Sequence, residues 1–168
     1  MKFTQLLKKY SLFILSCLFT VPLLALATVS ATSTTVSEDN GISIPLTSRG
    51  TSTFYITAQL GDTKPNRFMV DTGSGYTTIN EDSLALLKEK GQAIFVKNIG
   101  GILADGSERI VPIWRVNSIA LNDACILNNV EVAVFPGKTR QLLGVSALKK
   151  AGSVTLTFDP PMLTLKAC

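Results

Sequence analysis

Short runs of alternating apolar and polar residues fill most of the chain after residue 41 and predict β-strands. These runs are rich in β-branched and aromatic residues, and glycine, proline, asparagine or aspartate bounds them, as at turns. The predicted strands cover residues 42–46, 53–60, 67–70, 76–79, 93–97, 109–121, 130–135, 154–158 and 162–165. Many short strands joined by turns predict a small, mostly antiparallel β domain.

One segment, residues 80–90, has the pattern of a helix instead. Asn80 can cap its start, two acidic residues follow, and two lysines precede Gly91, which ends it. Its buried side is predicted to consist of three leucines: Leu84, Leu86 and Leu87. A second, short helix is predicted over residues 145–151. The fold is therefore expected to contain one main helix.

The N-terminal region differs in pattern from the rest of the chain. Three lysines and a long apolar run lead to small residues with two cleavage patterns, ending at Ala27 and Ala31. This order is typical of a secretory signal peptide over residues 1–31, and an uncleaved membrane anchor is the alternative. A flexible segment over 32–49 and a folded domain over 50–168 are expected to follow. The predicted location is periplasmic or secreted, or anchored in the inner membrane.

The net charge of +4 comes largely from that N-terminal region. Without residues 1–31 the chain loses three of its 16 basic residues and none of its 12 acidic ones. The remainder then carries 13 basic and 12 acidic residues, a net charge of +1. No basic patch with interleaved aromatic residues is present in the sequence, so a nucleic-acid partner is not expected.

Two cysteines, Cys125 and Cys168, remain in the predicted domain. An exported protein lies where disulfides persist. The two cysteines can pair within the chain, pair across a dimer or stay free, because their spacing alone does not decide. Cys125 can also serve as a small buried apolar residue.

The absence of histidine excludes several catalytic mechanisms and metal sites. The 168 residues contain none, which excludes Ser-His and Cys-His nucleophiles and any histidine-based metal site. No metal cluster or phosphate-binding loop is recognisable in the sequence, so no metal and no cofactor is expected. Carboxylate chemistry remains as the plausible hydrolytic mechanism.

The segment that carries such chemistry runs from Phe68 to Gly75, where an apolar strand leads into Asp71 and a turn of small residues. Burial of its neighbours would make the protonation of Asp71 tunable. Gly73 permits a tight turn that brings a backbone N–H to the carboxylate. Thr72 can cross-link the base of the site, and Ser74 can donate a hydrogen bond to Asp71.

This segment resembles the aspartic protease signature, in which two apolar residues precede Asp-Thr-Gly-Ser. The family's second signature, two apolar residues and a glycine behind the catalytic loop, is matched by Leu142, Leu143 and Gly144. The order and spacing are similar to those of the single-domain, retropepsin-like proteases of bacteria. The resemblance covers roughly residues 50–166 and implies a small closed antiparallel β-barrel of the retropepsin-like type with one main helix.

The resemblance also implies a flap hairpin between the two signatures. Its turn would be formed around Asp105-Gly106, a sequence that favours hairpins. The flap and substrate-binding residues would be Gly101, Leu103, Ala104, Asp105 and Gly106. Unlike the flaps of many relatives, this one has no tyrosine at its tip.

Asp71 lies in the chain's single Asp-[Ser/Thr]-Gly triplet, whereas this chemistry needs two carboxylates. A two-fold homodimer would place Asp71 beside its copy, and residues 162–168 are a candidate interface. The expected function is an aspartic endopeptidase acting on peptides or proteins, with an acidic pH optimum. A non-catalytic exported domain that binds peptides or envelope partners is the first alternative, and a structural β-barrel is the second.

Overall fold

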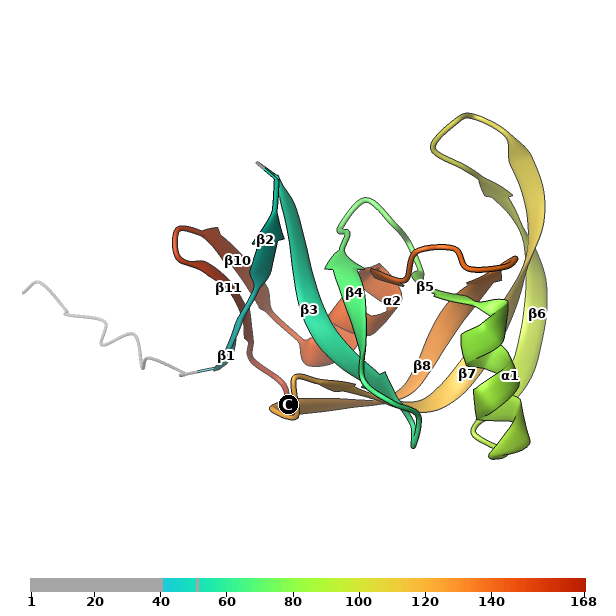
Figure 1. The fold of residues 1–168 in the computed structure, drawn as a ribbon, viewed down its shortest axis with the longest axis horizontal. Coiled ribbons are helices and arrows are strands. Elements are labelled where there is room, and N and C mark those ends of the chain that lie inside the picture. The colour runs from blue at the N-terminus through green and yellow to red at the C-terminus, as the bar shows by residue number, and fades with distance from the viewer. Residues whose placement is uncertain (1–40, 51) are drawn as a thin grey trace, which may run out of the picture. The chain divides into compact units, whose positions relative to one another are not determined.

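Two β-sheets make up the fold in the computed structural model, which describes residues 41–50 and 52–168 (Figure 1). The strands of the larger sheet are β2 Thr47–Arg49, β3 Thr53–Leu60, β4 Asn66–Val70, β5 Thr77–Asn80, β6 Ala93–Ile102, β7 Glu108–Leu121, β8 Cys125–Phe135 and β9 Leu142–Leu143. The smaller sheet contains β1 Ile42–Pro45, β10 Val154–Phe158 and β11 Pro161–Leu165. The helices are α1 Glu81–Glu89 and α2 Val145–Leu148, and a 3-10 turn over Lys149–Ala151 follows α2. The mostly β prediction is confirmed.

The larger sheet mixes antiparallel and parallel pairs, in the order β2-β3-β4-β9-β5-β8-β7-β6. The pairs β4–β9 and β5–β8 are parallel, and β9, from a distant part of the chain, enters between β4 and β5. β3 also pairs with β7, with Ala58 opposite Leu121. The antiparallel prediction is therefore incomplete, and closure of the whole sheet into a barrel stays a prediction.

The ends of α1 follow from the local sequence. Asn80 caps the helix by accepting a hydrogen bond from the Ser83 N–H at 2.9 Å. Gly91, just beyond the helix, has a φ of 66°, which glycine adopts without strain. Leu87 is buried, but Leu86 is 49% exposed, so its predicted burial is wrong. At 3.6 residues per turn, Leu86 lies about 200° around the helix from Leu84.

The main hydrophobic core contains residues of both sheets and both helices. Phe68 of β4 and Leu163 of β11 are fully buried in it, and burial of each such side chain stabilises the fold by roughly 1.5–3 kcal/mol. A second, smaller cluster consists of three buried side chains with four others packed against it: Val111, Ile113 and Ala133, with Tyr76, Val96, Ile99 and Phe135. This second cluster supports the region in which Asp71 lies.

A disulfide between Cys125 and Cys168 ties the C-terminus to the start of β8. The sequence left open whether the two cysteines pair within the chain, pair across a dimer or stay free, and the structure has them paired within one chain. The two cysteines are 43 residues apart, and a cross-link over that distance stabilises the folded state by about 4 kcal/mol in the chain-entropy view.

The ordered region begins before residue 50. β1 confirms the strand predicted over residues 42–46, and both β1 and β2 lie within residues 32–49, which were predicted to be a flexible segment. β1 pairs with β11, with Ile44 buried opposite Leu163, and this pairing explains the order. Residues 1–40, and with them the signal-peptide prediction, lie outside the described residues. Among residues 41–50 and 52–168, no helix is long and apolar enough to cross a membrane.

Candidate active site

Asp71 directly follows β4 and is held by the backbone on both sides. Its N–H donates to the Leu143 carbonyl at 3.1 Å, and its own carbonyl accepts from the Ser74 N–H at 3.3 Å. The Gly73 N–H donates to the Asp71 carboxylate at 2.9 Å. Gly73 is suited to this contact, because a Cβ there would lie 3.2 Å from the same carboxylate oxygen. The loop is therefore wrapped around the carboxyl group.

The two hydroxyl residues of the loop have different surroundings. Thr72 is exposed. The Ser74 hydroxyl donates to the Tyr76 carbonyl at 2.7 Å, so the predicted hydrogen bond from Ser74 to Asp71 is absent from the structure. The tight turn directs this hydroxyl along the chain instead, where it stabilises the loop's own backbone.

The segment of the second signature lies against the loop, as predicted. Leu142 and Leu143 of β9 pair in parallel with Met69 and Val70 of β4. Beyond them, the N–H groups of residues 145 and 146 donate to the carbonyls of residues 74 and 75 at 2.9 and 3.1 Å. Gly144 packs so closely that a Cβ there would collide with the Tyr76 carbonyl oxygen and lie 2.8 Å from the Thr77 nitrogen. Only glycine fits this contact.

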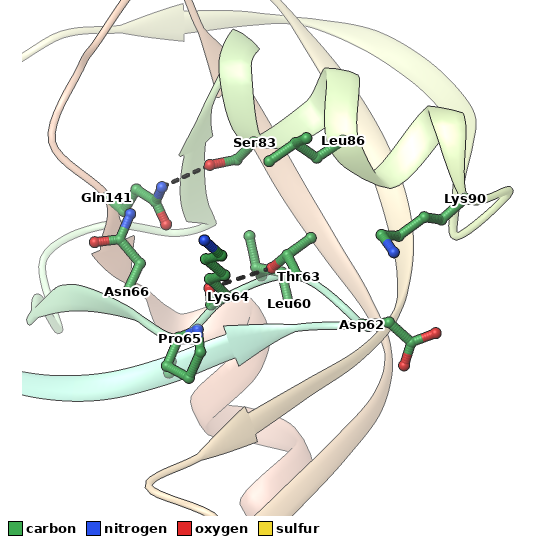
Figure 2. Close-up of a pocket in the computed structure, with 11 residues that line it drawn as sticks. Leu60, Asp62, Thr63, Lys64, Pro65, Asn66, Ser83, Leu86, Lys90 and Gln141 are labelled. Atoms are coloured by element: carbon green, nitrogen blue, oxygen red, sulfur yellow. Dashed lines mark hydrogen bonds between the residues drawn. The ribbon is translucent and has the colours of Figure 1, made fainter.

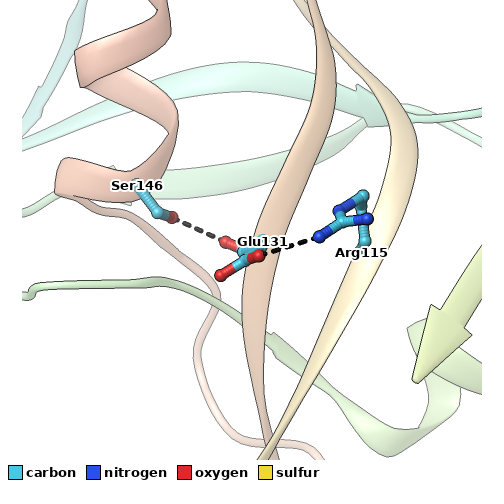
Figure 3. A network of polar contacts seen from close by, with 3 residues as sticks. All are labelled: Arg115, Glu131 and Ser146. Carbon is cyan, nitrogen blue, oxygen red and sulfur yellow. Dashed lines mark hydrogen bonds and ion pairs between the residues drawn. The ribbon is translucent and has the colours of Figure 1, made fainter. Parts of the chain in front are cut away.

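The Ser146 side chain links the segment around the Asp71 loop to β8 (Figure 3). Its hydroxyl donates to the Glu131 carbonyl at 2.7 Å and accepts from the Thr77 N–H at 2.8 Å. The Glu131 carboxylate pairs with Arg115 at 3.1 Å. Both side chains of that ion pair are partly exposed, so the pair adds at most about 1 kcal/mol. The hydroxyl bridge therefore links β8 to the start of β5, directly after the loop.

Asp71 lines a cleft of about 580 Å³ between the loop and the β6–β7 hairpin. In Figure 1 this hairpin projects beyond the rest of the sheet, with its tip on the side of the loop that follows β4. The wall is mostly apolar, formed by Ile99, Val111, Ala133, Phe135 and Leu142. Such a cleft, apolar with a few polar groups, suits a peptide or another ligand of that size.

The predicted flap residues divide into two groups. Gly101, Leu103 and Ala104 line the cleft together with Asp71. Asp105 and Gly106, which were predicted to bind substrate with the others, form the turn at the hairpin tip and are not part of the lining. Gly106 has a φ of 80° and donates its N–H to the Leu103 carbonyl at 2.9 Å, which closes the turn.

The turn at the flap tip depends on an ionised Asp105. The pKa of the Asp105 carboxyl lies below its ordinary value because the Ser107 hydroxyl donates to it at 2.7 Å and the Ser107 N–H at 2.9 Å. A lowered pKa means that these bonds stabilise the turn above the unfolded-state pKa and are lost as the pH falls through the lowered value. We therefore expect acid to remove this contribution of Asp105 to the turn.

We expect Ser107→Ala to raise the pKa of Asp105 toward its ordinary value. The substitution removes the hydroxyl hydrogen bond, which lowers this pKa more than the backbone hydrogen bond does. NMR titration of the Asp105 carboxyl carbon in both proteins measures this. Ser153→Ala, at another exposed serine, is the matched control. An unchanged Asp105 titration in Ser107→Ala would contradict the assigned cause.

Several lining residues were not predicted from the sequence: Tyr76, Thr78, Ile99, Val111, Ala133, Phe135, Thr139 and Arg140. Alternation in residues 130–135 places Ala133 and Phe135 on one face of a strand and could have indicated these two. No local signal identifies Arg140, which reaches the cleft only because β9 lies beside β4.

A second cavity, of about 550 Å³, lies between the β3–β4 turn, α1 and Gln141 (Figure 2). Gln141 is 4% exposed and donates to the Ser83 hydroxyl at 2.7 Å, while its Oε1 has no partner. Asp71 is not part of this cavity. The bond to Ser83 joins α1 to the residue before β9, so we assign Gln141 a structural role.

No three histidine, cysteine or acidic side chains in the described residues gather into a group able to hold a metal ion. The arrangement that remains is one oriented carboxylate beside an apolar cleft under a hairpin. A carboxylate in such a place can accept or donate a proton and activate a water molecule.

Comparison with known proteins agrees with this geometry. The model of the family described as gag-polyprotein putative aspartyl protease matches residues 56–150. No curated protein sequence matches the chain. Among solved structures, the chain is similar to the crystal structure of a retropepsin-like aspartic protease from Rickettsia conorii. The TM-score is 0.56 and the identity 20%, over 74% of this chain and 91% of that chain. At this identity the likeness shows the fold, which is retropepsin-like.

Proposed function

Because the chain belongs to the gag-polyprotein putative aspartyl protease family, we propose that it is an aspartic endopeptidase whose active site two copies of the chain complete. The observation that carries the proposal is the Asp71 carboxylate, oriented by the Gly73 N–H beside a cleft of peptide-binding size. An extended peptide would bind under the flap by main-chain hydrogen bonds, with its side chains in alternate pockets.

The chemistry requires two carboxylates that share one proton. One accepts a proton from a water molecule, which attacks the scissile carbonyl, while the other donates a proton to the carbonyl oxygen. Two carboxylates in contact do not both ionise readily, so the pair keeps one proton at mildly acidic pH. With no histidine in the chain to supply a base near neutral pH, we expect an acidic optimum.

The second carboxylate would come from a second copy, because Asp71 lies in the chain's single Asp-Thr-Gly triplet. A two-fold axis beside the loop brings the two Asp71 residues together. Within the earlier candidate interface, residues 162–168, β11 already has β1 on one side and β10 on the other. β10 has a free edge, and its Phe158 is 66% exposed. We therefore propose that the partner contacts β10 as well as residues 162–168.

Subunit mixing tests the dimer. We expect an excess of Asp71→Asn subunits, mixed with the unaltered chain, to suppress activity almost completely, because most active subunits then pair with an inactive partner. An equal excess of Lys149→Gln subunits, altered at an exposed residue, is the control. Initial rates of peptide cleavage after equilibration give the result. Activity that neither falls on mixing nor depends on subunit concentration would rule out the shared site.

Incubation of the full chain with a peptide library between about pH 4 and 7 tests the function itself. We expect cleavage that a pepstatin-type inhibitor blocks and that Asp71→Asn lacks. Peptide binding without cleavage at any of these pH values would instead support the non-catalytic alternative, which the flap without a tip tyrosine leaves open.

We further propose that the protein is exported, since its N-terminal sequence is typical of a signal peptide and a disulfide joins Cys125 to Cys168. In protein recovered from the source cells, we expect both cysteines to resist a thiol reagent until they are reduced. We expect the N-terminus to follow Ala27 or Ala31. Mass spectrometry after alkylation measures both. Free thiols on an intact N-terminus would contradict export with cleavage.

A further inference from the structure

Four basic residues lie together beside the cleft: Arg49, Arg67, Lys138 and Arg140. We call them the basic rim. They line a shallow hollow of about 310 Å³ that contains no acidic residue. All four side chains are exposed. Because the predicted mature chain has a net charge of only +1, the rim is a local concentration of positive charge and does not reflect the charge of the whole domain.

The positions of these residues follow from the strand register. Arg67 and Met69 alternate with buried Phe68 on β4, so they share the outer face of that strand. The Arg67 guanidinium lies 5.1 Å from the centre of the Tyr55 ring, which holds it in place. Arg140 donates to the Met69 sulfur at 3.6 Å. Arg67 and Arg140 are thus connected through one strand face.

The rim has no internal charge compensation. Within the described residues, the ion pair of the structure joins Arg115 to Glu131, and no rim residue forms one with a carboxylate. Glu81, which follows β5, binds the Gly137 N–H at 2.9 Å and is not part of the hollow. Like charges without counter-charges repel one another and so do not stabilise the fold. They do produce a positive potential that attracts anionic groups.

The rim is continuous with the cleft of Asp71. Thr139 and Arg140 line both the hollow and the cleft, and Leu142, two residues further on, lies in the cleft wall. Arg140 and Asp71 are the charged residues among the cleft's lining. An extended chain held beside Asp71 would therefore pass Arg140 first and the other rim residues after it.

We propose that the basic rim is a specificity site that selects peptide substrates with acidic side chains close to the scissile bond. The proposal rests on the proposed function and adds the substrate class. Arginine suits this task because its planar guanidinium binds a carboxylate through two hydrogen bonds. The apolar wall would accept aliphatic or aromatic side chains at neighbouring positions. In a two-fold dimer each subunit contributes a rim, so acidic residues would be favoured on both sides of the bond.

A peptide fits these observations better than another polyanion does. Nucleic acid usually combines phosphate contacts with exposed aromatic rings for stacking, and here Arg67 already lies over Tyr55. An anionic membrane would need a broad basic face, whereas this hollow opens into an apolar cleft beneath a hairpin.

The test uses the full chain and a sequence that it cuts in the peptide library. Glu and Gln versions are made at each of the three positions on either side of the cut, and kcat/KM is measured at about pH 6, where glutamate is ionised. We expect at least one Glu version to be cut roughly ten-fold faster than its Gln counterpart, as for a charge-assisted hydrogen bond. We expect Arg140→Gln to remove most of this difference in kcat/KM between the Glu and Gln peptides. Added salt should reduce the difference, and Lys149→Gln should leave it unchanged.

The outcomes separate this inference from the proposed function. Asp71-dependent cleavage with equal rates for all Glu and Gln pairs would overturn the inference and leave the function intact. If no peptide is cut, the function fails, and fluorescence anisotropy decides about the rim, with labelled library peptides that bind the chain, each made in a Glu and a Gln version. Equal dissociation constants would then overturn it, and tighter Glu binding that Arg140→Gln abolishes would support it. The inference would also be overturned if Arg140→Gln left the ratio of the Glu to the Gln cleavage rates unchanged but abolished binding of the chain to phosphatidylserine vesicles or single-stranded RNA.

Discussion

Asp71→Asn is expected to abolish peptide cleavage, with a loss of at least roughly 10²–10⁴-fold in kcat, the range that positioned proton transfer contributes. Asparagine has the shape of aspartate and its carbonyl oxygen still accepts the Gly73 N–H, so the loop keeps its conformation. It does not take up or release the proton that the reaction needs. In a dimer both copies carry the change, so neither carboxylate of the pair remains.

Steady-state kinetics on a peptide from the library measures the loss, and circular dichroism during heating measures the fold. We expect the melting temperature to stay within a few degrees of the unaltered protein, because Asp71 lies in a surface loop and forms no ion pair within the described residues. Asp123→Asn is the matched control. It makes the same change in an exposed turn, where the φ of 54° suits asparagine as well as aspartate. Full activity of Asp71→Asn would refute the assignment of the catalytic residue.

Gly144→Ala is expected to have the largest effect on stability. The new methyl group would collide with the backbone oxygen of Tyr76 and crowd the Thr77 nitrogen. Backbone atoms do not rotate out of the way as a side chain does, so β9 or the loop from Asp71 to Tyr76 must move. We expect the free energy of unfolding to fall by about 3 kcal/mol or more, at the upper end for overpacking of a core.

Because the same displacement pulls the second signature away from the Asp71 loop, we expect activity to fall together with stability. Urea unfolding and soluble yield measure the first, and peptide cleavage the second. Gly100→Ala is the control: no atom lies within 4 Å of its added methyl group, so we expect a change within about 0.5 kcal/mol. If the Gly144→Ala protein were as stable as the Gly100→Ala protein, residue 144 would not lie in close contact with the backbone of Tyr76 and Thr77 in solution.

Features that depend on neighbours in the chain could be predicted from the sequence. The cap at Asn80, the end of α1 at Gly91 and the turn at Asp105-Gly106 all involve residues only a few positions apart. Strand β3 was predicted with its observed bounds, because its alternation and its flanking turn residues are local. Capping, turn formation and periodicity act over one or two turns of chain, so the sequence displays them directly.

Features that depend on distant segments were missed or left open. The parallel insertion of β9 between β4 and β5 joins residues more than sixty positions apart, and no periodicity encodes it. The pairing of Cys125 with Cys168 and the central place of β11 between β1 and β10 are similar cases. The Ser74 hydroxyl was assigned to the wrong acceptor because its direction depends on a loop conformation that sequence does not specify.

The sequence by itself determined that the chain carries one candidate catalytic carboxylate in a glycine turn, and that a glycine must lie behind it. The first follows from side-chain chemistry in a tight turn, and the second from the resemblance to the aspartic protease signatures. The tertiary structure alone decided what surrounds that carboxylate: the apolar wall, the hairpin beside it and the basic rim that reaches it through Arg140. The reason is that a site's surroundings come from strands far apart in the chain, which come together only through long-range pairing and burial of the core.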